Sequence, residues 1–384
     1  MNFVEKIKIR PNNELIGRFK ELCNNSRFIY NWLLGYCLKN KCNPMDALNK
    51  YRTLVKDGSL YDQKTGVVYN DNFLKSLKNT PSQISDIATG NLKQAFKTSK
   101  KSKIPSFKSK YKSKMAFTIH KKTDSTFRLE DGFLKITKIA AFKLDLSKLR
   151  FINSETDIKR ITISESTYGW YISILIDIPD DQFVIKDNNT SIVGIDWGIK
   201  RFATDSDGYY YSFKDHPAYK VYKSLEKKLK HLQSILGKKR DKNKSWKLSK
   251  KYRLLKFKIK QVYERMANIR KDFLHETSKS YIEEYGTIVI ENLKPSNLLK
   301  NHKLARSIAE GMFYTWKVFL TYKSALYGRD LIIVNPMNTS QTCNHCGTIL
   351  KEKLKLSNRI FKCNHCGLKE DRDVNAAKNI LSLA

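Results

Sequence analysis

The chain has 384 residues, enough for two or three domains with separate hydrophobic cores. Its 73 Lys and Arg residues against 37 Asp and Glu give a net charge of +36, which opposes compaction unless a polyanion neutralises it, so nucleic acid is the expected partner. A membrane protein is not expected, because no stretch approaches the roughly 20 apolar residues of a membrane helix. The first residues lack the apolar core of a secretion signal, so we expect a cytoplasmic location.

The N-terminal part combines one predicted strand with a block of helices. Apolar and basic residues alternate over residues 1–10, which predicts a strand that Pro11 ends. Apolar residues then recur at helical spacing over residues 14–39, 46–56 and 70–79. A further helix is predicted from Pro81, which suits a position in the first turn.

A strongly basic segment follows these helices. Between Asp86 and Asp124 the chain has eleven lysines and no acidic residue, and Phe107 and Tyr111 lie among the lysines. The segment Lys93–Lys122 is either a solvated linker or a nucleic-acid contact. Lysines that alternate with aromatic residues suit a phosphate backbone with a stacked base, so we favour the second interpretation.

The next segment is rich in predicted strands, over Phe133–Ile139, Arg160–Ser166 and Trp170–Ile178. A turn at Asp131-Gly132 precedes the first of them. Together with the N-terminal strand, residues 1–13 and 115–186 are predicted to close a small β-barrel. Residues 14–114 would then be a helical insertion into that barrel.

From Ser191 onward, short buried strands end in a carboxylate. Residues 192–196 form an apolar strand that ends in Asp196 and opens a predicted meander of three strands. Residues 287–291 form a second apolar strand, which ends in Glu291. A strand-end carboxylate is by itself weak evidence for function, because such a residue is usually a cap or part of a turn.

Residues 220–273 are predicted to form an antiparallel helical hairpin. One apolar stripe runs from Leu225 to Ile235, and a heptad seam runs from Leu248 to Phe273, with Gly237 between them. The hairpin carries twenty Lys and Arg residues against few acidic ones, among them Glu226, Asp241 and Glu264. Such an excess favours a nucleic-acid surface over a face that is merely soluble.

Beyond Glu291 the chain is predicted to continue with a basic loop and helix that contain His302, Lys303 and Arg306. Residues 331–334 form a further short apolar strand. The cysteine-rich segment follows this strand.

Two Cys-x-x-Cys pairs predict a structural zinc site. The four ligands would be Cys343, Cys346, Cys363 and Cys366, with sixteen residues between the pairs, which is typical of a zinc ribbon over residues 340–369. Paired disulfides are the alternative, but a lysine-rich chain without a signal peptide indicates a reducing compartment. Four thiolates fill a tetrahedral site, so His345 and His365 are interpreted as bystanders.

Three further cysteines, Cys23, Cys37 and Cys42, lie far from these pairs in sequence. They are interpreted as buried free thiols.

An acidic cluster, Glu370 to Asp373, follows the second cysteine pair and opens a predicted helix. Together with Asp196 and Glu291 it provides three candidate acids. Converging carboxylates repel one another, so stability alone gives no reason to gather them. Two divalent cations about 3.5–4 Å apart would relieve the repulsion and hydrolyse a phosphodiester. Oxygen ligands favour magnesium or manganese.

Several motifs resemble those of the transposon-associated TnpB family. Residues 194–200, GIDWGIK, resemble its first RuvC motif, residues 290–293, IENL, the second, and residues 371–380, DRDVNAAKNI, the third. The cysteine pairs match the zinc ribbon of that family. Residues 27–31, RFIYN, resemble its N-terminal helical signature.

The resemblance implies an α+β multidomain protein of prokaryotic type. It would have an RNase H-like (RuvC) nuclease domain over residues 187–384 with an inserted zinc ribbon, preceded by a wedge-type barrel with a helical recognition insertion. The implied activity is RNA-guided, magnesium-dependent cleavage of double-stranded DNA beside a short adjacent motif. The guide RNA would come from the transposon end, and one protein chain would form each ribonucleoprotein, which associates with the nucleoid when on DNA.

By this resemblance the catalytic magnesium ligands would be Asp196, Glu291 and Asp373, with Asp371 as the alternative third acid. The miniature type V CRISPR effectors share all three motifs, so they are the nearest alternative. A nuclease-dead, RNA-guided DNA-binding repressor would lack one acid, whereas this chain has all three. A plain zinc-ribbon DNA-binding protein would not need buried strands that end in acids.

Overall fold

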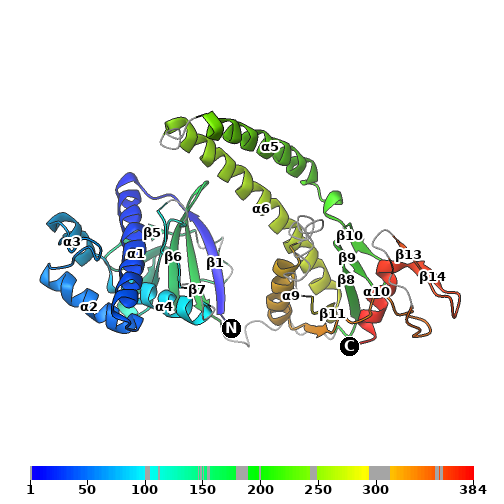
Figure 1. Ribbon diagram of the computed structural model, residues 1–384. Coiled ribbons are helices and arrows are strands. Elements are labelled where there is room, and N and C mark those ends of the chain that lie inside the picture. Colours follow the sequence, from blue (N-terminus) through cyan, green and yellow to red (C-terminus); the bar gives the residue numbers. More distant parts are fainter. Residues whose placement is uncertain are drawn as a thin grey trace. The chain divides into compact units, whose positions relative to one another are not determined.

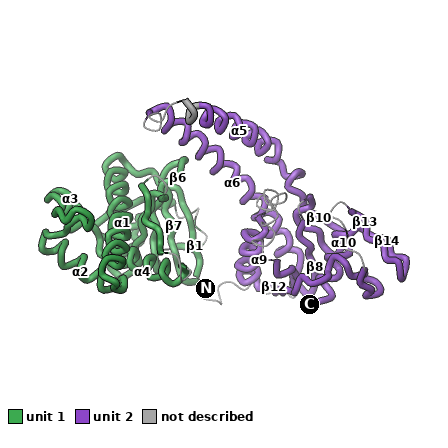
Figure 2. Tube along the Cα trace, in the orientation of Figure 1, with its two compact units in different colours: residues 1–179 green, residues 180–384 purple. Residues whose placement is uncertain are grey.

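The computed structural model describes residues 2–99, 104–110, 113–145, 147, 149, 151–153, 156–178, 189–198, 200–242, 249–293, 312–350, 354 and 358–384. These residues form an α+β chain with two compact units, Met1–Pro179 and Asp180–Ala384 (Figure 2). Within the described residues, no helix has the length and apolar character needed to cross a bilayer. The predicted basic loop and helix with His302, Lys303 and Arg306 lie outside them.

The first unit contains a four-stranded antiparallel sheet in the order β1-β7-β6-β2. Its strands are β1 (Asn2–Ile9), β2 (Ala116–His120), β6 (Ile158–Ser166) and β7 (Gly169–Asp177). Alternate residues of β7, from Trp170 to Ile176, are buried, which is the period-two pattern of a sheet with one face on the core. The N-terminal strand therefore pairs with a strand that lies far from it in the sequence.

Three short strands form a second sheet: β3 (Phe127–Glu130), β4 (Phe133–Ile136) and β5 (Ala140–Lys143). Asp131 and Gly132, both with positive φ, make the predicted turn between β3 and β4. The single predicted strand Phe133–Ile139 was wrong, because Lys138 adopts a φ of 65° and turns the chain between β4 and β5. Among the described residues the strands of this unit pair as two sheets, so the closed barrel stays a prediction.

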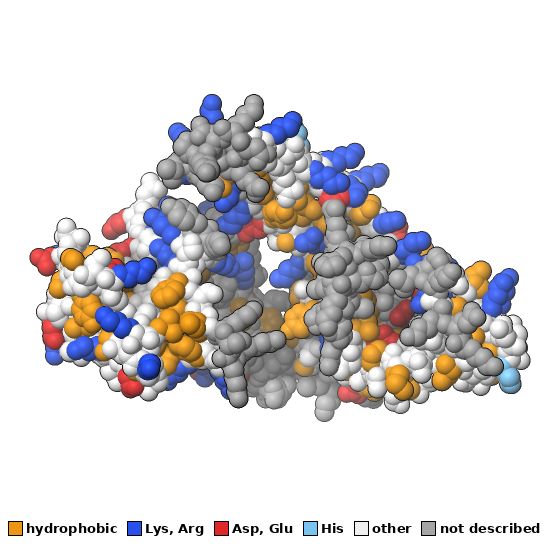
Figure 3. Space-filling view, viewed as in Figure 1, with side chains coloured by type: hydrophobic (Ala, Val, Ile, Leu, Met, Phe, Trp, Pro, Cys, Tyr) orange, Lys and Arg blue, Asp and Glu red, His pale blue; other side chains and the backbone are white. Residues whose placement is uncertain are grey.

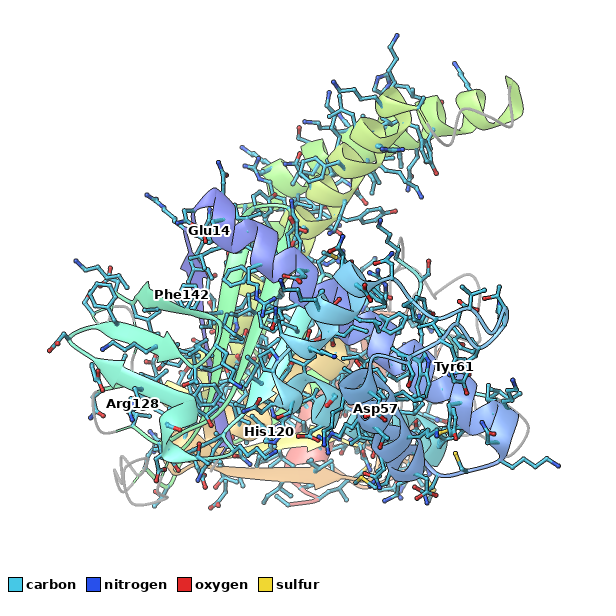
Figure 4. The ribbon with its side chains drawn as sticks, turned by 90° about the vertical axis from the view of Figure 1, so that its left-hand side faces the viewer. Glu14, Asp57, Tyr61, His120, Arg128 and Phe142 are labelled. Atoms are coloured by element: carbon cyan, nitrogen blue, oxygen red, sulfur yellow. The ribbon has the colours of Figure 1, made fainter. Side chains whose placement is uncertain are left out.

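The described residues of the first unit also form four α-helices: α1 (Asn13–Asn40), α2 (Pro44–Asp57), α3 (Asp71–Lys78) and α4 (Ser82–Thr98). The side chains of Asn12, Asn43 and Asn70 cap the first three, whereas Pro81 precedes the first turn of α4 instead of lying within it. The ring of Phe19 on α1 contacts Phe117 of β2 and Phe142 of β5, so this helix packs on both sheets. Figure 4 labels Phe142.

The second unit is built on a mixed five-stranded sheet in the order β10-β9-β8-β11-β12. Its strands are β8 (Ile192–Trp197), β9 (Ala203–Asp205), β10 (Tyr210–Tyr211), β11 (Thr287–Glu291) and β12 (Asp330–Val334). The pairs β8–β11 and β11–β12 are parallel, and β8–β9–β10 is the predicted antiparallel meander. The carboxyl ends of β8, β11 and β12 therefore meet at one edge.

Helices α6 (Lys250–Glu284) and α9 (Phe313–Tyr327) cover one face of this sheet and α10 (Arg372–Leu381) covers the other, whereas α5 (Tyr219–Lys242) packs on α6 (Figure 1). Residues of α6 and α9, among them Tyr281 and Trp316, pack on one face, and Ile380 of α10 packs on the other. Strands β13 (Ile360–Lys362) and β14 (Lys369–Asp371) form the ribbon hairpin. Helix α6 continues beyond the predicted end at Phe273, and α9 was not predicted.

Helix α10 lies directly against β8 at Gly194. A Cβ atom added to this glycine would lie 2.2 Å from the main-chain oxygen of Ala377 and 2.6 Å from the amide nitrogen of Leu381. Both are backbone atoms of a packed helix, so neither can move aside easily. Glycine is required here because it allows this close approach.

Gly194→Ala is expected to lower the free energy of unfolding by about 1–3 kcal/mol, because the extra methyl group forces α10 away from β8. Urea denaturation of the full chain measures the change. The matched control is Gly237→Ala on exposed α5, where nothing lies within 4 Å of the added Cβ. That exchange should stabilise the chain by up to about 1 kcal/mol. Equal effects of the two exchanges would contradict the importance of the close approach.

Candidate active site and metal centre

Two of the predicted acids end neighbouring parallel strands. The β8–β11 register pairs Ile195 with Ile290, and Asp196 and Glu291 are the next residue on each strand. Asp196 is half-buried and Glu291 is buried. Side chains alternate between the faces of a strand, so Asp196 shares the face of Gly194, which α10 covers.

The third acid comes from the first turn of α10. The side chain of Asp373 is only 13% exposed, and its carboxylate is close enough to Asp196 to help raise the pKa of that residue. The contact of α10 with β8 at Gly194 brings this turn to the edge where the two strands end. Three acids that are distant in sequence therefore lie near one another, close enough for Glu291 and Asp373 to act electrostatically on Asp196.

Charge repulsion is present within this cluster. Removal from water, and next the carboxylates of Glu291 and Asp373, raise the pKa of Asp196 well above its usual range, while Arg372 opposes the shift. Burial also raises the pKa of Glu291, and a hydrogen bond from the Thr339 hydroxyl partly offsets this. The carboxylates of Glu291 and Asp373 thus destabilise the charged form of Asp196, and a divalent cation would relieve this repulsion.

The two aspartates of the third motif have different contacts. One oxygen of Asp371 accepts the amide hydrogens of Asp373 and Val374, at 2.9 and 3.3 Å, and so caps α10. Its other oxygen accepts a hydrogen bond of 2.8 Å from Arg201. Asp373 instead contacts the Arg359 guanidinium at 3.2 Å. Both oxygens of Asp371 are engaged in positioning the helix, which favours Asp373 as the metal ligand.

Asp371→Ala is therefore expected to weaken α10 by about 0.5–2 kcal/mol, the usual cost of a lost cap, and to slow DNA cleavage without abolishing it. Asp373→Ala should abolish cleavage. Asp371→Asn is the matched control, because asparagine caps a helix as well as aspartate does. Cleavage assays on the three variants check this, and an inactive Asp371→Ala beside an active Asp373→Ala would reverse the assignment.

The four predicted cysteine ligands lie together. Their sulfur atoms are all within 4.8 Å of one another, and the Cys343–Cys366 and Cys346–Cys363 distances are both 3.6 Å. Tetrahedral zinc with Zn–S bonds of about 2.3 Å needs sulfur atoms roughly 3.8 Å apart, so the cluster fits this ion. His345 and His365 are exposed and are not part of the cluster.

Glycines shape both turns around this cluster. Gly347 and Gly367 have φ values of 72° and 79°, in the left-handed region that glycine adopts without strain. The main-chain nitrogen of each glycine donates to the carbonyl of the first cysteine in its pair, Cys343 or Cys363. The two turns are therefore built alike. Of the other cysteines, Cys23 and Cys37 are buried and Cys42 is partly exposed.

The hairpin formed by α5 and α6 has an apolar seam and basic outer faces. Leu225 and Leu229 of α5 pack against Val262 and Met266 of α6. Figure 3 shows Lys and Arg side chains along this hairpin. The exposed basic residues among those described are Lys220, Lys223, Lys227, Lys228, Lys230, Lys238, Lys250, Lys251, Arg253, Lys256, Lys258, Lys260, Arg265 and Lys271.

Part of the basic segment Lys93–Lys122 is held against helix α1. Asn31 of α1 exchanges two hydrogen bonds, of 2.7 and 2.9 Å, with the backbone of Lys108, whose ammonium lies 4.0 Å from the ring centre of Tyr30. Burial lowers the pKa of Lys108. Ile104 and Phe107 are exposed beside it. The RFIYN signature thus anchors the segment, and the apolar residues next to Lys108 are left on the surface.

Comparison with known proteins identifies the family. A "Probable transposase" family model matches residues 173–302, and a "Cas12f1-like, TNB domain" model matches residues 313–380. A putative RNA-guided DNA endonuclease of Streptomyces pristinaespiralis is 33% identical over 314 residues, which are 81% of this chain and 72% of the relative. The putative RNA-guided DNA endonuclease InsQ of Escherichia coli (strain K12) is 30% identical over 399 residues, 98% of this chain and 91% of the relative. The chain belongs to the TnpB family.

The fold of this TnpB-family chain resembles that of Cas12f1. In the structure of a Cas12f1–sgRNA–target DNA complex, the protein aligns with a TM-score of 0.57 and 18% sequence identity. The alignment covers 96% of this chain and 83% of that one. At this level of identity the likeness concerns the fold alone.

Three contacts of the candidate site were not predicted from the TnpB motifs. Arg201 pairs with Asp371, Arg359 pairs with Asp373, and Thr339 donates to Glu291. Arg201 follows the first motif closely, so its position alone could have suggested a role. Arg359 and Thr339 lie in loops without a distinctive pattern, and only the folded chain brings them to the acids.

Proposed function

We propose that this TnpB-family protein is an RNA-guided DNA endonuclease with a single RuvC-like site. The observation that carries the proposal is the proximity of Asp196, Glu291 and Asp373, where burial and next the neighbouring carboxylates raise the pKa of Asp196. Such a cluster is costly without a cation and useful with one. The endonuclease names of the two relatives agree with this chemistry.

In this proposal the three acids hold magnesium at the edge where β8 and β11 end. Bound divalent cations supply Lewis-acid activation for phosphodiester hydrolysis. Each carboxylate acts as a ligand and not as a proton donor, and its location on a packed sheet or helix limits its movement. The mixed sheet with helices on both faces supports an RNase H-like assignment. Zinc in the four-cysteine cluster would have a structural role.

The partners in this proposal are a guide RNA derived from the transposon end and a double-stranded DNA target. The first unit would be the wedge-type barrel with its helical recognition insertion, which reads a short motif beside the target while base pairing reads the sequence. The solved Cas12f1 complex holds sgRNA and target DNA, and its likeness in fold supports such partners. We propose one protein chain per ribonucleoprotein, at work in the cytoplasm.

The purified complex tests the proposal directly. RNA that co-purifies with the chain is sequenced, and a DNA duplex is made that matches its variable part beside a randomised flank. We expect magnesium-dependent cleavage of that duplex, with a preferred flanking sequence among the cut molecules. A duplex with a scrambled target is the control. Guided binding without cleavage would indicate the repressor alternative, and a CRISPR-type repeat in the RNA would indicate the type V effector alternative.

The hairpin surface provides a separate prediction. Lys256→Gln, Lys258→Gln and Lys260→Gln, combined, should weaken nucleic-acid binding and reduce the slope of log affinity against log salt by roughly 2–3, because each lost phosphate contact contributes about 0.7–0.9. Filter binding over a range of salt concentrations measures this slope. Triple exchange of Lys135, Lys159 and Lys279, each paired with a carboxylate, is the matched control. An unchanged slope would make the hairpin lysines ordinary solvated residues.

A further inference from the structure

Glu291 has a partner from the segment before the zinc knuckle. The hydroxyl of Thr339 donates to Oε1 of Glu291, and both side chains are buried, Thr339 with 5% of its surface exposed. The carbonyl of Thr339 in turn accepts a hydrogen bond of 2.8 Å from the side-chain amide of Asn379 on α10. One residue therefore joins the end of β11 to the helix that carries Asp373.

Two asparagines of α10 hold the segment that leads from Thr339 to the first zinc ligand. Asn379 also donates to the carbonyl of Thr342 at 2.7 Å, and Asn375, one helical turn earlier, donates to the same carbonyl at 2.8 Å. The side-chain oxygen of Asn375 accepts from the backbone and the side-chain amides of Asn344, at 3.0 and 2.9 Å. Asn375 is completely buried.

These hydrogen bonds are needed because the side chains of Asn375 and Asn379 are both buried. A buried amide is destabilising unless its hydrogen bonds are made, and here residues 339–344 supply the partners of both asparagines. The same segment has Thr339 at one end and reaches Cys343, in the zinc cluster, near the other. Hydrogen bonds therefore connect the segment that carries the first zinc ligand with the carboxylate of Glu291.

We propose that Thr339 is a positioning residue for Glu291, and that Asn375 and Asn379 couple its position to the zinc ribbon. The inference rests on the proposed function, in which Glu291 is a metal ligand. The hydroxyl donates to Oε1, so Oε2 would be the oxygen available to a cation. Partners of this kind orient ligating carboxylates, and their loss commonly costs 10–100-fold in metal affinity or activity.

Thr339→Val tests the role of the hydroxyl, because valine keeps the shape of the side chain and removes the donor. In the complete ribonucleoprotein, we expect half-maximal cleavage to need about 10–100-fold more magnesium, while the rate at saturating magnesium changes less. Thr339→Ser restores the donor and should restore the wild-type magnesium requirement. An unchanged magnesium requirement in Thr339→Val would overturn the proposal.

A binding measurement without cleavage supplies the second readout. Manganese is titrated into each complex without target DNA, and the bound ion is measured by electron paramagnetic resonance. The amount bound by the Glu291→Gln complex is subtracted, so that only the ion bound at the proposed site is counted. Thr339→Val should weaken this binding by the same factor, and Thr339→Ser should not. Equal manganese binding by Thr339→Val and wild type also overturns the proposal. Zinc content and thermal unfolding establish that each variant is folded, and Thr339→Ala replaces the valine variant if it is not.

The coupling is tested by a double-mutant cycle. Asn379→Ala alone should raise the magnesium requirement, and combining it with Thr339→Val should add little, because both act on the same carboxylate. If the two changes in magnesium requirement are fully additive, Asn379 does not act through Glu291. Glu291→Gln distinguishes the two levels of the argument. If Glu291→Gln still cuts, the proposed active site fails, whereas an inactive Glu291→Gln with a normal Thr339→Val sinks only the positioning role.

Discussion

Asp196→Ala is expected to abolish guided DNA cleavage, by at least about a thousandfold, while guided DNA binding stays nearly intact. Loss of a shared metal ligand removes several kcal/mol of transition-state stabilisation, and each 1.36 kcal/mol is a tenfold change in rate. In the proposed function, binding depends instead on base pairing and on basic surfaces distant in sequence. Glu291→Ala and Asp373→Ala should behave alike. Single-turnover cleavage and gel-shift binding with the same duplex separate the two effects.

The cause of this loss is distinguishable from unfolding. Burial, and next the neighbouring carboxylates, raise the pKa of Asp196, so its charge destabilises the folded chain when no cation is bound. Asp196→Asn should therefore be inactive yet at least as resistant to heat as the wild type in buffer without added magnesium. Asp330→Ala, an exposed acid at the start of β12, is the matched control and should keep full activity. If none of the three acids matters for cleavage, the nuclease proposal fails.

Cys343→Ser is expected to lose the zinc ion and the ordered ribbon together. In small zinc domains the binding of structural zinc contributes about 10–16 kcal/mol to the free energy of folding. The other contacts of the ribbon cannot supply this stabilisation when the ion is lost. Cleavage should also be lost, because the knuckle is tied to α10 through Asn344 and Asn375. Atomic absorption gives the zinc content, and limited proteolysis reports the ordering of residues 340–369.

The matched control for this variant is Cys42→Ser, which lies in the other unit and should retain zinc and activity. Wild-type protein should contain one zinc per chain, with all four cysteines of the cluster reduced and none in a disulfide. Protein without zinc, with these cysteines oxidised in pairs, would restore the disulfide alternative. A Cys343→Ser variant that keeps stoichiometric zinc would show that another residue completes the site.

Local patterns predicted the elements that carry the candidate site. The apolar runs that end in Asp196 and Glu291 are strands β8 and β11, and the two apolar stripes predicted within residues 220–273 pack against each other as helices α5 and α6. These patterns were readable because each element buries one side with a regular period. Helix α9 was missed because large residues such as Phe313 and Trp316 are mixed with exposed ones such as Tyr314, which blurs the period.

The sequence by itself determined the chemistry on offer: three acids in family motifs, four cysteines with zinc-ribbon spacing and a large excess of positive charge. Only the tertiary structure decided how they meet. Parallel pairing of β8 with β11 aligns Asp196 with Glu291, and the missing side chain of Gly194 lets α10 bring Asp373 to them. The roles of Asp371 as a cap and Thr339 as a hydrogen-bond donor follow from contacts between distant segments. No local period encodes such contacts, because they depend on how whole elements pack.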